Sequence, residues 1–106
     1  MAWVIMAAVT PVVAVCAHNL YQGEALEYCT YNYSEIPNGF GDDRATAMRY
    51  LVQVHYFCPL EHPARAVVRD LRRALEAADF TSPSVEDAGD DLCQHYVLEC
   101  EGIDGG

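Results

Sequence analysis

The chain has 106 residues and a mass of 11.7 kDa, which is the size of one domain and leaves no room for two independent cores. Acidic residues outnumber basic ones by 16 to 6, the net charge at pH 7 is −10, and every base is an arginine. Nucleic acids and anionic membranes attract proteins through their phosphates, so this charge argues against both as primary partners. About half of the residues (52%) are apolar, which argues against a fully disordered chain.

The first residues predict a short helix and then a buried strand. Residues 2–9 are apolar on every side, and Pro11 prevents a helix from continuing far beyond them, so we expect a short, largely buried helix. Residues 12–18 are rich in β-branched side chains and predict a strand with both faces covered. A turn over residues 19–23 follows.

The middle of the chain predicts two strands joined by a loop. Residues 25–33 are dense in tyrosine and predict a strand, whereas residues 35–43 contain proline, glycine and aspartate and predict a loop. Residues 46–58 alternate between an apolar face and a mixed face, which is typical of a strand. Because the mixed face includes leucine, histidine and phenylalanine, we expect it to meet something other than bulk water.

The last third of the chain predicts the most regular helix and one more strand. Within residues 63–79 the apolar side chains recur every three or four positions, and a proline opens the segment. Residues 81–93 predict an acidic loop, residues 94–100 predict a last strand, and residues 101–106 predict a loose polar tail.

The predicted order of elements is therefore α-β-β-β-α-β. Residues 1–106 form a single domain, because no repeat, low-complexity segment or linker divides them. Such an order is typical of an α+β fold in which an antiparallel-rich sheet carries the helices on one face. At this length the core is modest, so we expect oligomerisation to contribute to stability.

Cysteine usage leaves two locations open. The chain has five cysteines, an odd number without a C-x-x-C pair, which favours free thiols in a reducing cytosol. Alternatively, residues 1–17 act as a signal peptide without a basic start, and cleavage near Ala17 leaves a secreted binding module with four cysteines. The cysteines are Cys16, Cys29, Cys58, Cys93 and Cys100.

Two cysteines and two histidines fall at spacings that a zinc site can accommodate, because side chains two positions apart on a strand share a face. A small zinc or thiol protein is therefore a second alternative, although buried free cysteines more often pack as core residues. The set consists of Cys58, His62, Cys93 and His95. No motif for a catalytic nucleophile or a phosphate-binding loop is present, so we expect neither an enzyme nor a cofactor.

Charge is segregated along the chain. Residues 63–79 hold four of the six bases, whereas residues 86–104 hold seven acids and no base. A helix with arginines on its outer face beside a wholly acidic segment suits head-to-tail self-association, and the alternative is an ordinary solvated surface. We predict that contacts with subunits or partners involve Asp42, Asp43, Arg44, Arg65, Arg69, Arg72 and Arg73.

Several segments, in order along roughly residues 11–101, carry a resemblance to a known family, although none of them is a strict motif. The segments are HNLYQG (18–23), YCTYNY (28–33), QVHYFCP (53–59), AADFT (77–81), PSVED (83–87) and QHYVLECE (94–101). In these segments the chain resembles small prophage-encoded proteins of tailed phages, of the tail terminator or tail completion (head–tail joining) type.

This resemblance implies an α+β subunit of a homo-oligomeric ring, often a hexamer. Such a ring caps the phage tail-tube protein, stops its polymerisation and offers a surface to the head-completion protein. The resemblance also implies assembly in the bacterial host cytoplasm, a final place in the virion tail or neck, no catalytic residue and no cofactor. The first helix departs from the pattern because it is very short and lacks a polar face, so we expect a neighbouring subunit to shield it.

Overall fold

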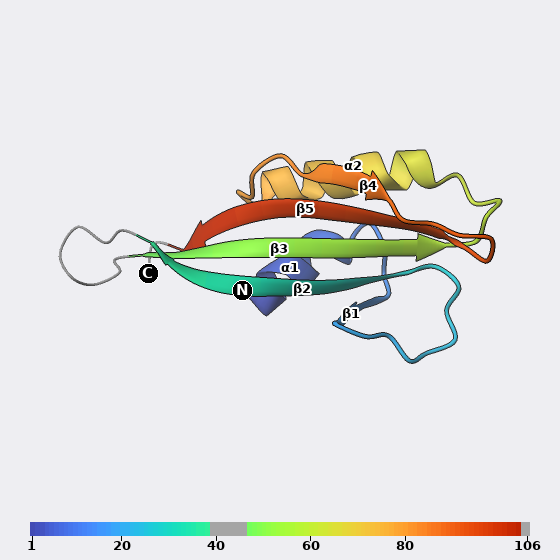
Figure 1. Cartoon of the computed structure of the whole chain (residues 1–106), viewed down its shortest axis with the longest axis horizontal. Helices are drawn as coiled ribbons and strands as arrows, with labels where there is room; N and C mark the ends of the chain where they lie inside the picture. Colours follow the sequence, from blue (N-terminus) through green and yellow to red (C-terminus); the bar gives the residue numbers. More distant parts are fainter. Residues whose placement is uncertain (39–46, 105–106) are drawn as a thin grey trace.

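The computed structural model describes residues 1–38 and 47–104, which form two helices and five strands (Figure 1). In chain order the elements are α1 (Ala2–Val9), β1 (Cys16–His18), β2 (Tyr28–Asn38), β3 (Ala47–Cys58), α2 (Ala64–Ala77), β4 (Ser84–Asp87) and β5 (Gln94–Asp104). The strands form one sheet in the order β1-β2-β3-β5-β4. Strand β1 runs parallel to β2, and the other neighbouring pairs are antiparallel.

Both helices lie on the same face of this sheet, so the molecule has two layers (Figure 1). We call this face of the sheet the covered face and the opposite one the open face. The arrangement confirms the predicted α+β fold with an antiparallel-rich sheet, and it adds the strand β4 to the predicted order of elements.

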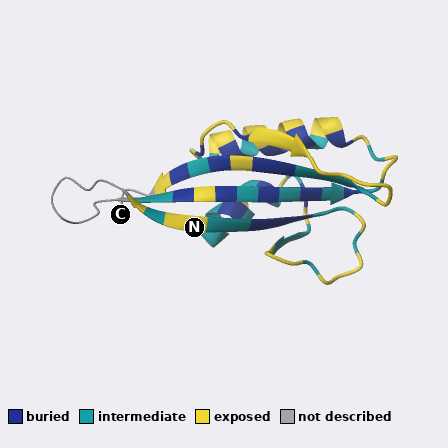
Figure 2. Ribbon diagram, viewed as in Figure 1, coloured by how far each residue is buried: buried dark blue, intermediate teal, exposed yellow. Residues whose placement is uncertain are grey.

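Alternate side chains of the long strands form the core beneath the helices. Along β3, buried residues alternate with more exposed ones (Figure 2). The alternation follows from the two-residue period of a strand, which sends successive side chains to opposite faces. The residues of β3 with at most 1% exposure are Val52, Val54, Tyr56 and Cys58. The completely buried residues of the helices are Ile5, Val9, Leu71 and Leu75.

Helix α2 is amphipathic and ends in a Schellman cap. After the helix, the N–H of Asp79 donates to the carbonyl of Glu76 and the N–H of Phe80 donates to that of Leu75, each at 3.1 Å. Asp79 adopts the left-handed φ of 72° that this motif requires. Phe80 is buried in the core, so the cap also returns the chain to the sheet.

The predicted strand over residues 12–18 is shorter than expected and lies at an edge. Val13 donates its N–H to the carbonyl of Val9 at 2.9 Å, so the chain after Pro11 continues a turn instead of pairing. Within residues 12–18, only Cys16–His18 pair with β2, and His18 is exposed. The prediction that both faces of this strand are covered is therefore wrong.

The predicted loop over residues 35–43 begins later than expected. Residues 35–38 continue β2 and pair with β3, whereas residues 39–43 lie outside the described residues. Pro37 is tolerated because β1 pairs with β2 only as far as Tyr31, so that no other described strand pairs with this edge of β2 at Pro37.

Two further predictions for the C-terminal part are corrected by pairing over long sequence distances. The predicted acidic loop over residues 81–93 contains β4, which pairs with β5. The predicted loose tail over residues 101–106 is part of β5 as far as Asp104, because this segment pairs with β3. Gly102 is buried there, since Phe80 lies where a side chain would project.

The N-terminal helix α1 is only partly covered. Ile5 and Val9 are completely buried in the core, whereas the side chain of Trp3 is 75% exposed. The prediction of a short helix is confirmed, but one side of this helix faces solvent. Neither of the described helices combines the length and apolar character needed to cross a membrane.

Candidate interaction surfaces

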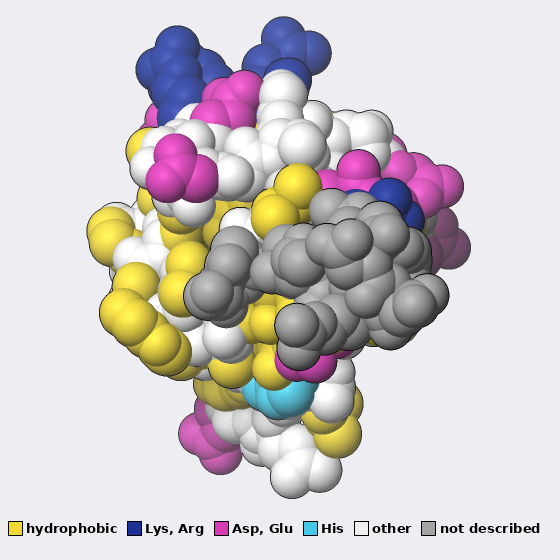
Figure 3. All heavy atoms as spheres, turned by 90° about the vertical axis from the view of Figure 1, so that its left-hand side faces the viewer, with side chains coloured by type: hydrophobic (Ala, Val, Ile, Leu, Met, Phe, Trp, Pro, Cys, Tyr) yellow, Lys and Arg dark blue, Asp and Glu magenta, His cyan; other side chains and the backbone are white. Residues whose placement is uncertain are grey.

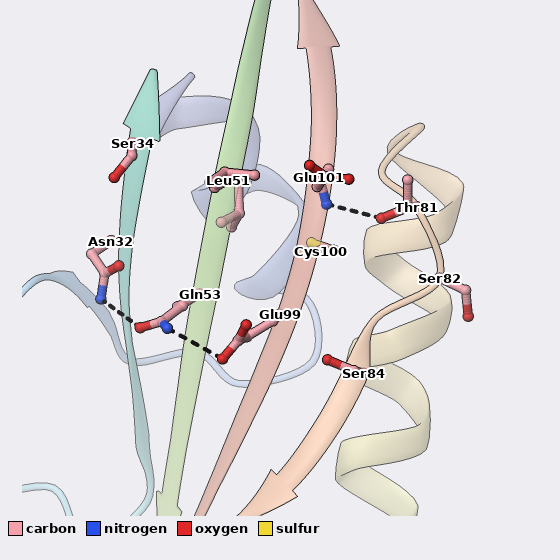
Figure 4. Close-up of a pocket in the computed structure, with 11 residues that line it drawn as sticks. Asn32, Ser34, Leu51, Gln53, Thr81, Ser82, Ser84, Glu99, Cys100 and Glu101 are labelled. Atoms are coloured by element: carbon pink, nitrogen blue, oxygen red, sulfur yellow. Dashed lines mark hydrogen bonds between the residues drawn. The ribbon is translucent and has the colours of Figure 1, made fainter. Parts of the chain in front are cut away.

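The open face of the sheet carries a row of polar side chains across three strands. Asn32 Nδ2 donates to Gln53 Oε1 at 3.5 Å, and Gln53 Nε2 donates to Glu99 Oε1 at 3.3 Å (Figure 4). Beside this row lies a groove of about 540 Å³ that extends to the segment before β4. There the N–H of Glu101 donates to Thr81 Oγ1 at 2.9 Å. The open face thus offers amide, hydroxyl and carboxylate groups to a partner.

Aromatic rings extend this polar row toward one end of the sheet. Phe57 stacks on His95 with 4.1 Å between the ring centroids and on Tyr28 with 4.8 Å. His55 Nδ1 lies 2.8 Å from His95 Nε2, so one of these nitrogens donates to the other. Tyr28 in turn packs on Tyr21 at 4.6 Å. The mixed face predicted for residues 46–58 therefore meets neighbouring rings as well as water.

The surroundings of the two histidines of this row favour the neutral form of each ring. Burial lowers the pKa of His55, and the nearby His95 lowers it further, whereas Glu99 acts in the opposite direction. Burial also lowers the pKa of His95, against the influence of Asp90 and Asp87. Each neutral imidazole has one nitrogen that donates and one that accepts, so the pair can share a hydrogen bond.

One end of the molecule exposes leucines on three loops. Strand β2 begins, β3 ends and β5 begins at this end, as their registers show. The loops of residues 59–63 and 88–93 therefore lie there, together with the part of the loop of residues 19–27 that leads into β2, and we call this surface the leucine-tipped end. Its leucines and their exposed fractions are Leu26 76%, Leu60 52% and Leu92 85%. Its charged residues are the acids Glu24, Glu27, Glu61, Asp90 and Asp91.

Hydrogen bonds fix these loops to the sheet. The hydroxyl of Tyr56 donates to Glu27 Oε2 at 2.5 Å, and the same carboxylate oxygen lies 2.9 Å from His62 Nε2. Gln94 Nε2 donates to three carbonyl oxygens of residues 59–62, at 2.7 Å in the case of His62. The leucines consequently project from a hydrogen-bonded framework.

The predicted arginine contacts fall into two groups. The residues of the first group, Arg65, Arg69, Arg72 and Arg73, are all exposed on the outer side of α2. Arg69 Nε lies 3.5 Å from Asp70 Oδ1, and among the described residues the other three arginines of α2 form no ion pair. Figure 3 shows arginine side chains projecting from the α2 edge of the molecule. The second group, Asp42, Asp43 and Arg44, lies outside the described residues.

A groove of about 450 Å³ separates α1 from the C-terminal half of α2, and we call it the α1–α2 groove. Among the described residues no charged side chain lines it, and most of its lining residues are alanines or other small apolar residues. Trp3 forms part of its wall. Hydrophobic side chains gather on this flank in Figure 3. The lining includes Ala7, Ala8, Ala74, Ala77 and Ala78.

The structure does not bring the four predicted zinc-site residues into one ligand set. Cys58 pairs with Gln94 and faces the helices, so His95, the next residue of β5, points to the open face. His62 contacts Glu27 instead of a cysteine. Within the described residues, no group of three or more potential ligands (His, Cys, Asp or Glu) is placed to hold a metal ion.

The cysteines are free thiols, and most of them behave as core residues. Burial raises the pKa of Cys16 to about 11 and that of Cys100 to about 11. Burial also raises the pKa of Cys29 and of Cys58. These thiols are therefore protonated at neutral pH, which makes them poor nucleophiles and poor metal ligands.

The arginine face of α2 could be predicted from the sequence, but the leucine-tipped end and the α1–α2 groove could not. The leucines at positions 26, 60 and 92 fall in a predicted strand, in a turn and in a predicted loop, far apart in the chain. Only the strand register places them at one end. The one available signal was the presence of isolated leucines among acidic and turn-forming residues.

Comparison with known proteins identifies a fold but no family. No family model matches the chain, and no curated protein matches it. Seven solved protein chains match it. One of them is 14% identical, with a TM-score of 0.57, over 98% of this chain and 94% of its own length. The name of that protein states no function, and at this identity the similarity shows the fold alone.

Proposed function

We propose that this chain is a structural virion protein of a tailed phage, a ring-forming subunit that caps the tail tube or joins the tail to the head. Its partners are further copies of itself, the tail-tube protein and the head-completion protein. It acts in the cytoplasm of the bacterial host during assembly and then in the tail or neck of the virion. The proposal starts from the resemblance of its sequence to tail terminator and tail completion proteins.

The observation that carries the proposal is the separation of exposed charge over the molecule. Helix α2 presents four exposed arginines, whereas the loops of the leucine-tipped end carry five acids and no base. A heterologous contact joins two different surfaces of identical subunits, and repeated contacts of this kind produce rings when the rotation closes. Complementary charges on two separate surfaces support such an arrangement.

Exposed apolar side chains support the same proposal. Besides the leucines, Trp3 on α1 is 75% exposed in a chain of only 106 residues. Apolar surface rimmed by polar groups commonly marks a protein–protein contact. In a ring, neighbouring subunits cover such apolar surface, so assembly removes it from water.

The test is native mass spectrometry at moderate salt, with and without the tail-tube protein encoded in the same genome. We expect multiples of the subunit on the tubes, and electron micrographs in which tubes stop growing when the protein is present. A monomer in isolation does not contradict the proposal, because rings can form on the tube. A strict monomer that neither binds nor caps tubes contradicts it.

A pair of charge variants sharpens this test. Changing Arg69 and Arg73 to Gln removes half of the arginines of α2, and we expect weaker assembly with a smaller dependence on salt. The control is Arg49→Gln, because Arg49 lies on the open face and contacts Glu101 there. If Arg49→Gln weakens assembly as much as the double variant does, the arginines of α2 have no specific role in assembly.

A further inference from the structure

The α1–α2 groove has the shape and chemistry of a receptor for aliphatic side chains. Its lining combines the wall formed by Trp3 with alanines from both helices, and alanines leave room for larger side chains. On α2, Arg73 precedes Ala77 by one helical turn and thus lies near the rim of the groove. The groove is therefore apolar inside, with a base at its margin.

The leucine-tipped end has the opposite features. Leu92, the most exposed of its leucines, follows two aspartates directly in the chain. Asp90 Oδ1 accepts hydrogen bonds from the N–H groups of Leu92 at 2.8 Å and of Cys93 at 3.2 Å, which holds the loop in one conformation. The surface is a set of aliphatic tips with an acidic rim.

The two surfaces lie toward opposite ends of the molecule. Helix α2 starts a few residues after β3 ends at the leucine-tipped end, and its 14 residues extend about 21 Å away from it (Figure 1). The groove is lined by Ala74 and Ala77 of the far part of α2 and by Ala78, which follows the helix. One copy therefore cannot place its own leucines in its own groove.

We infer that the leucine-tipped end of one copy docks into the α1–α2 groove of a second copy, with Leu92 and Leu60 entering the groove. This contact rests on the proposed ring-forming function and assigns its surfaces. Charge selects the occupant, since the leucine-tipped end carries five acids and no base, whereas α2 carries four arginines against Asp70 and Glu76. The contact is heterologous, so the first copy of a dimer retains a free groove and the second copy retains a free tip.

The experiment measures self-association by sedimentation velocity from micromolar concentrations to about 1 mM, where even a contact of about 4 kcal/mol is half formed. Two single-side variants are compared with the wild-type chain. Leu92→Ser removes a tip, and Ala77→Trp fills the groove at an exposed helix position. Because burial of one leucine side chain contributes more than a tenfold change in affinity, we expect each variant to weaken association at least tenfold.

Matched controls separate the contact from general effects. Leu51→Ser removes a leucine from the open face, and Ala66→Trp adds the same large ring to α2 outside the groove. Both controls are expected to associate like the wild-type chain. Circular dichroism of each variant confirms that it is folded.

Mixing the two single-side variants gives the decisive result. The Leu92→Ser chain retains its groove and the Ala77→Trp chain retains its tip, so an equimolar mixture should form heterodimers and no larger species. Wild-type association that neither variant weakens would overturn this contact and leave the proposed function standing. A wild-type chain that stays monomeric to about 1 mM would also overturn it, and if tail-tube protein then bound in an Ala77-dependent way, that protein would be the occupant of the groove.

Discussion

The two faces of the same sheet differ in what their side chains do. On the covered face, Val54 and Leu98 are completely buried and pair across β3 and β5. One position further along each strand, His55 and Glu99 belong to the open face and interact with neighbouring polar groups. Because the period of a strand is two, the same strands supply the stability of the fold and the chemistry of its surface. Substitutions on the two faces should therefore have different consequences.

The largest expected difference is between two leucines on adjacent strands. Leu98 is completely buried on the covered face, whereas Leu51 is 37% exposed on the open face. We expect Leu98→Ala to lower the free energy of unfolding by about 2–5 kcal/mol, because it leaves a cavity in the core. Leu51→Ala should lower it by about 1 kcal/mol or less, because the site is already half open to water. Urea denaturation of both variants checks this, and equal losses would contradict the division of the sheet into two faces.

The next largest effect is expected where the covered face lacks a side chain. A Cβ atom at position 102 would lie 2.7 Å from the ring of Phe80, so Gly102→Ala forces the ring to move. We expect a loss of about 1–3 kcal/mol from this overpacking. The double variant Gly102→Ala, Phe80→Leu should lose less than the sum of the two single variants, because the smaller side chain relieves the clash. Additive losses in thermal unfolding would show that the ring does not limit position 102.

A smaller effect is expected where a residue of the covered face reaches a loop. The hydroxyl of Tyr56 donates to Glu27 Oε2 at 2.5 Å, and burial together with this bond raises the pKa of Tyr56. We expect Tyr56→Phe to cost about 1.5 kcal/mol, the lower end of the usual range for a hydrogen bond to a charged group. Hydrogen exchange should also become faster in the loop of residues 19–27. Tyr33→Phe is the control, because within residues 1–38 and 47–104 the Tyr33 hydroxyl forms no hydrogen bond, and a similar cost there would contradict the role of the bond.

The elements predicted well from sequence are those defined by local periodicity. The apolar stripe of residues 63–79 and the alternation of residues 46–58 depend on neighbouring turns of the chain, and they predicted α2 and β3 to within a few residues. Strand β4 was missed because all four residues of Ser84–Asp87 are exposed and their burial shows no alternation. It is a strand only because its backbone pairs with β5. Pairing at long range is not encoded in any local window.

The candidate surfaces also differ in whether they depend on local periodicity or on long-range pairing. Helical periodicity was sufficient to place the arginines on the outer side of α2, because that inference concerns one element. The leucine-tipped end depends on three loops that the strand registers bring together, and no spacing in the sequence reveals this. The proposed zinc set failed for a related reason. Spacing alone did not show that Cys58 and His95 point to opposite faces.

The smallest expected effect concerns the pair His55 and His95 on the open face. Their pKa values are lowered in the folded chain by burial, whereas in the unfolded chain histidines titrate near pH 6.5. The unfolded state therefore binds more protons as the pH falls, so this contribution to stability is complete above about pH 6.5 and is lost as the pH drops through the lowered folded values.

The carboxylates that face this pair, Glu99 toward His55 and Asp87 and Asp90 toward His95, oppose the lowering and keep the effect modest. Urea denaturation at pH 7.5 and at pH 5.5 should show a smaller loss of stability in the variant His55→Gln, His95→Gln than in the wild-type chain. His18→Gln is the control, because His18 is exposed and stacks on Tyr31 at the other edge of the sheet. If the double variant and the wild-type chain lose equal stability over this range, the two histidines of the open face contribute no pH-dependent stability.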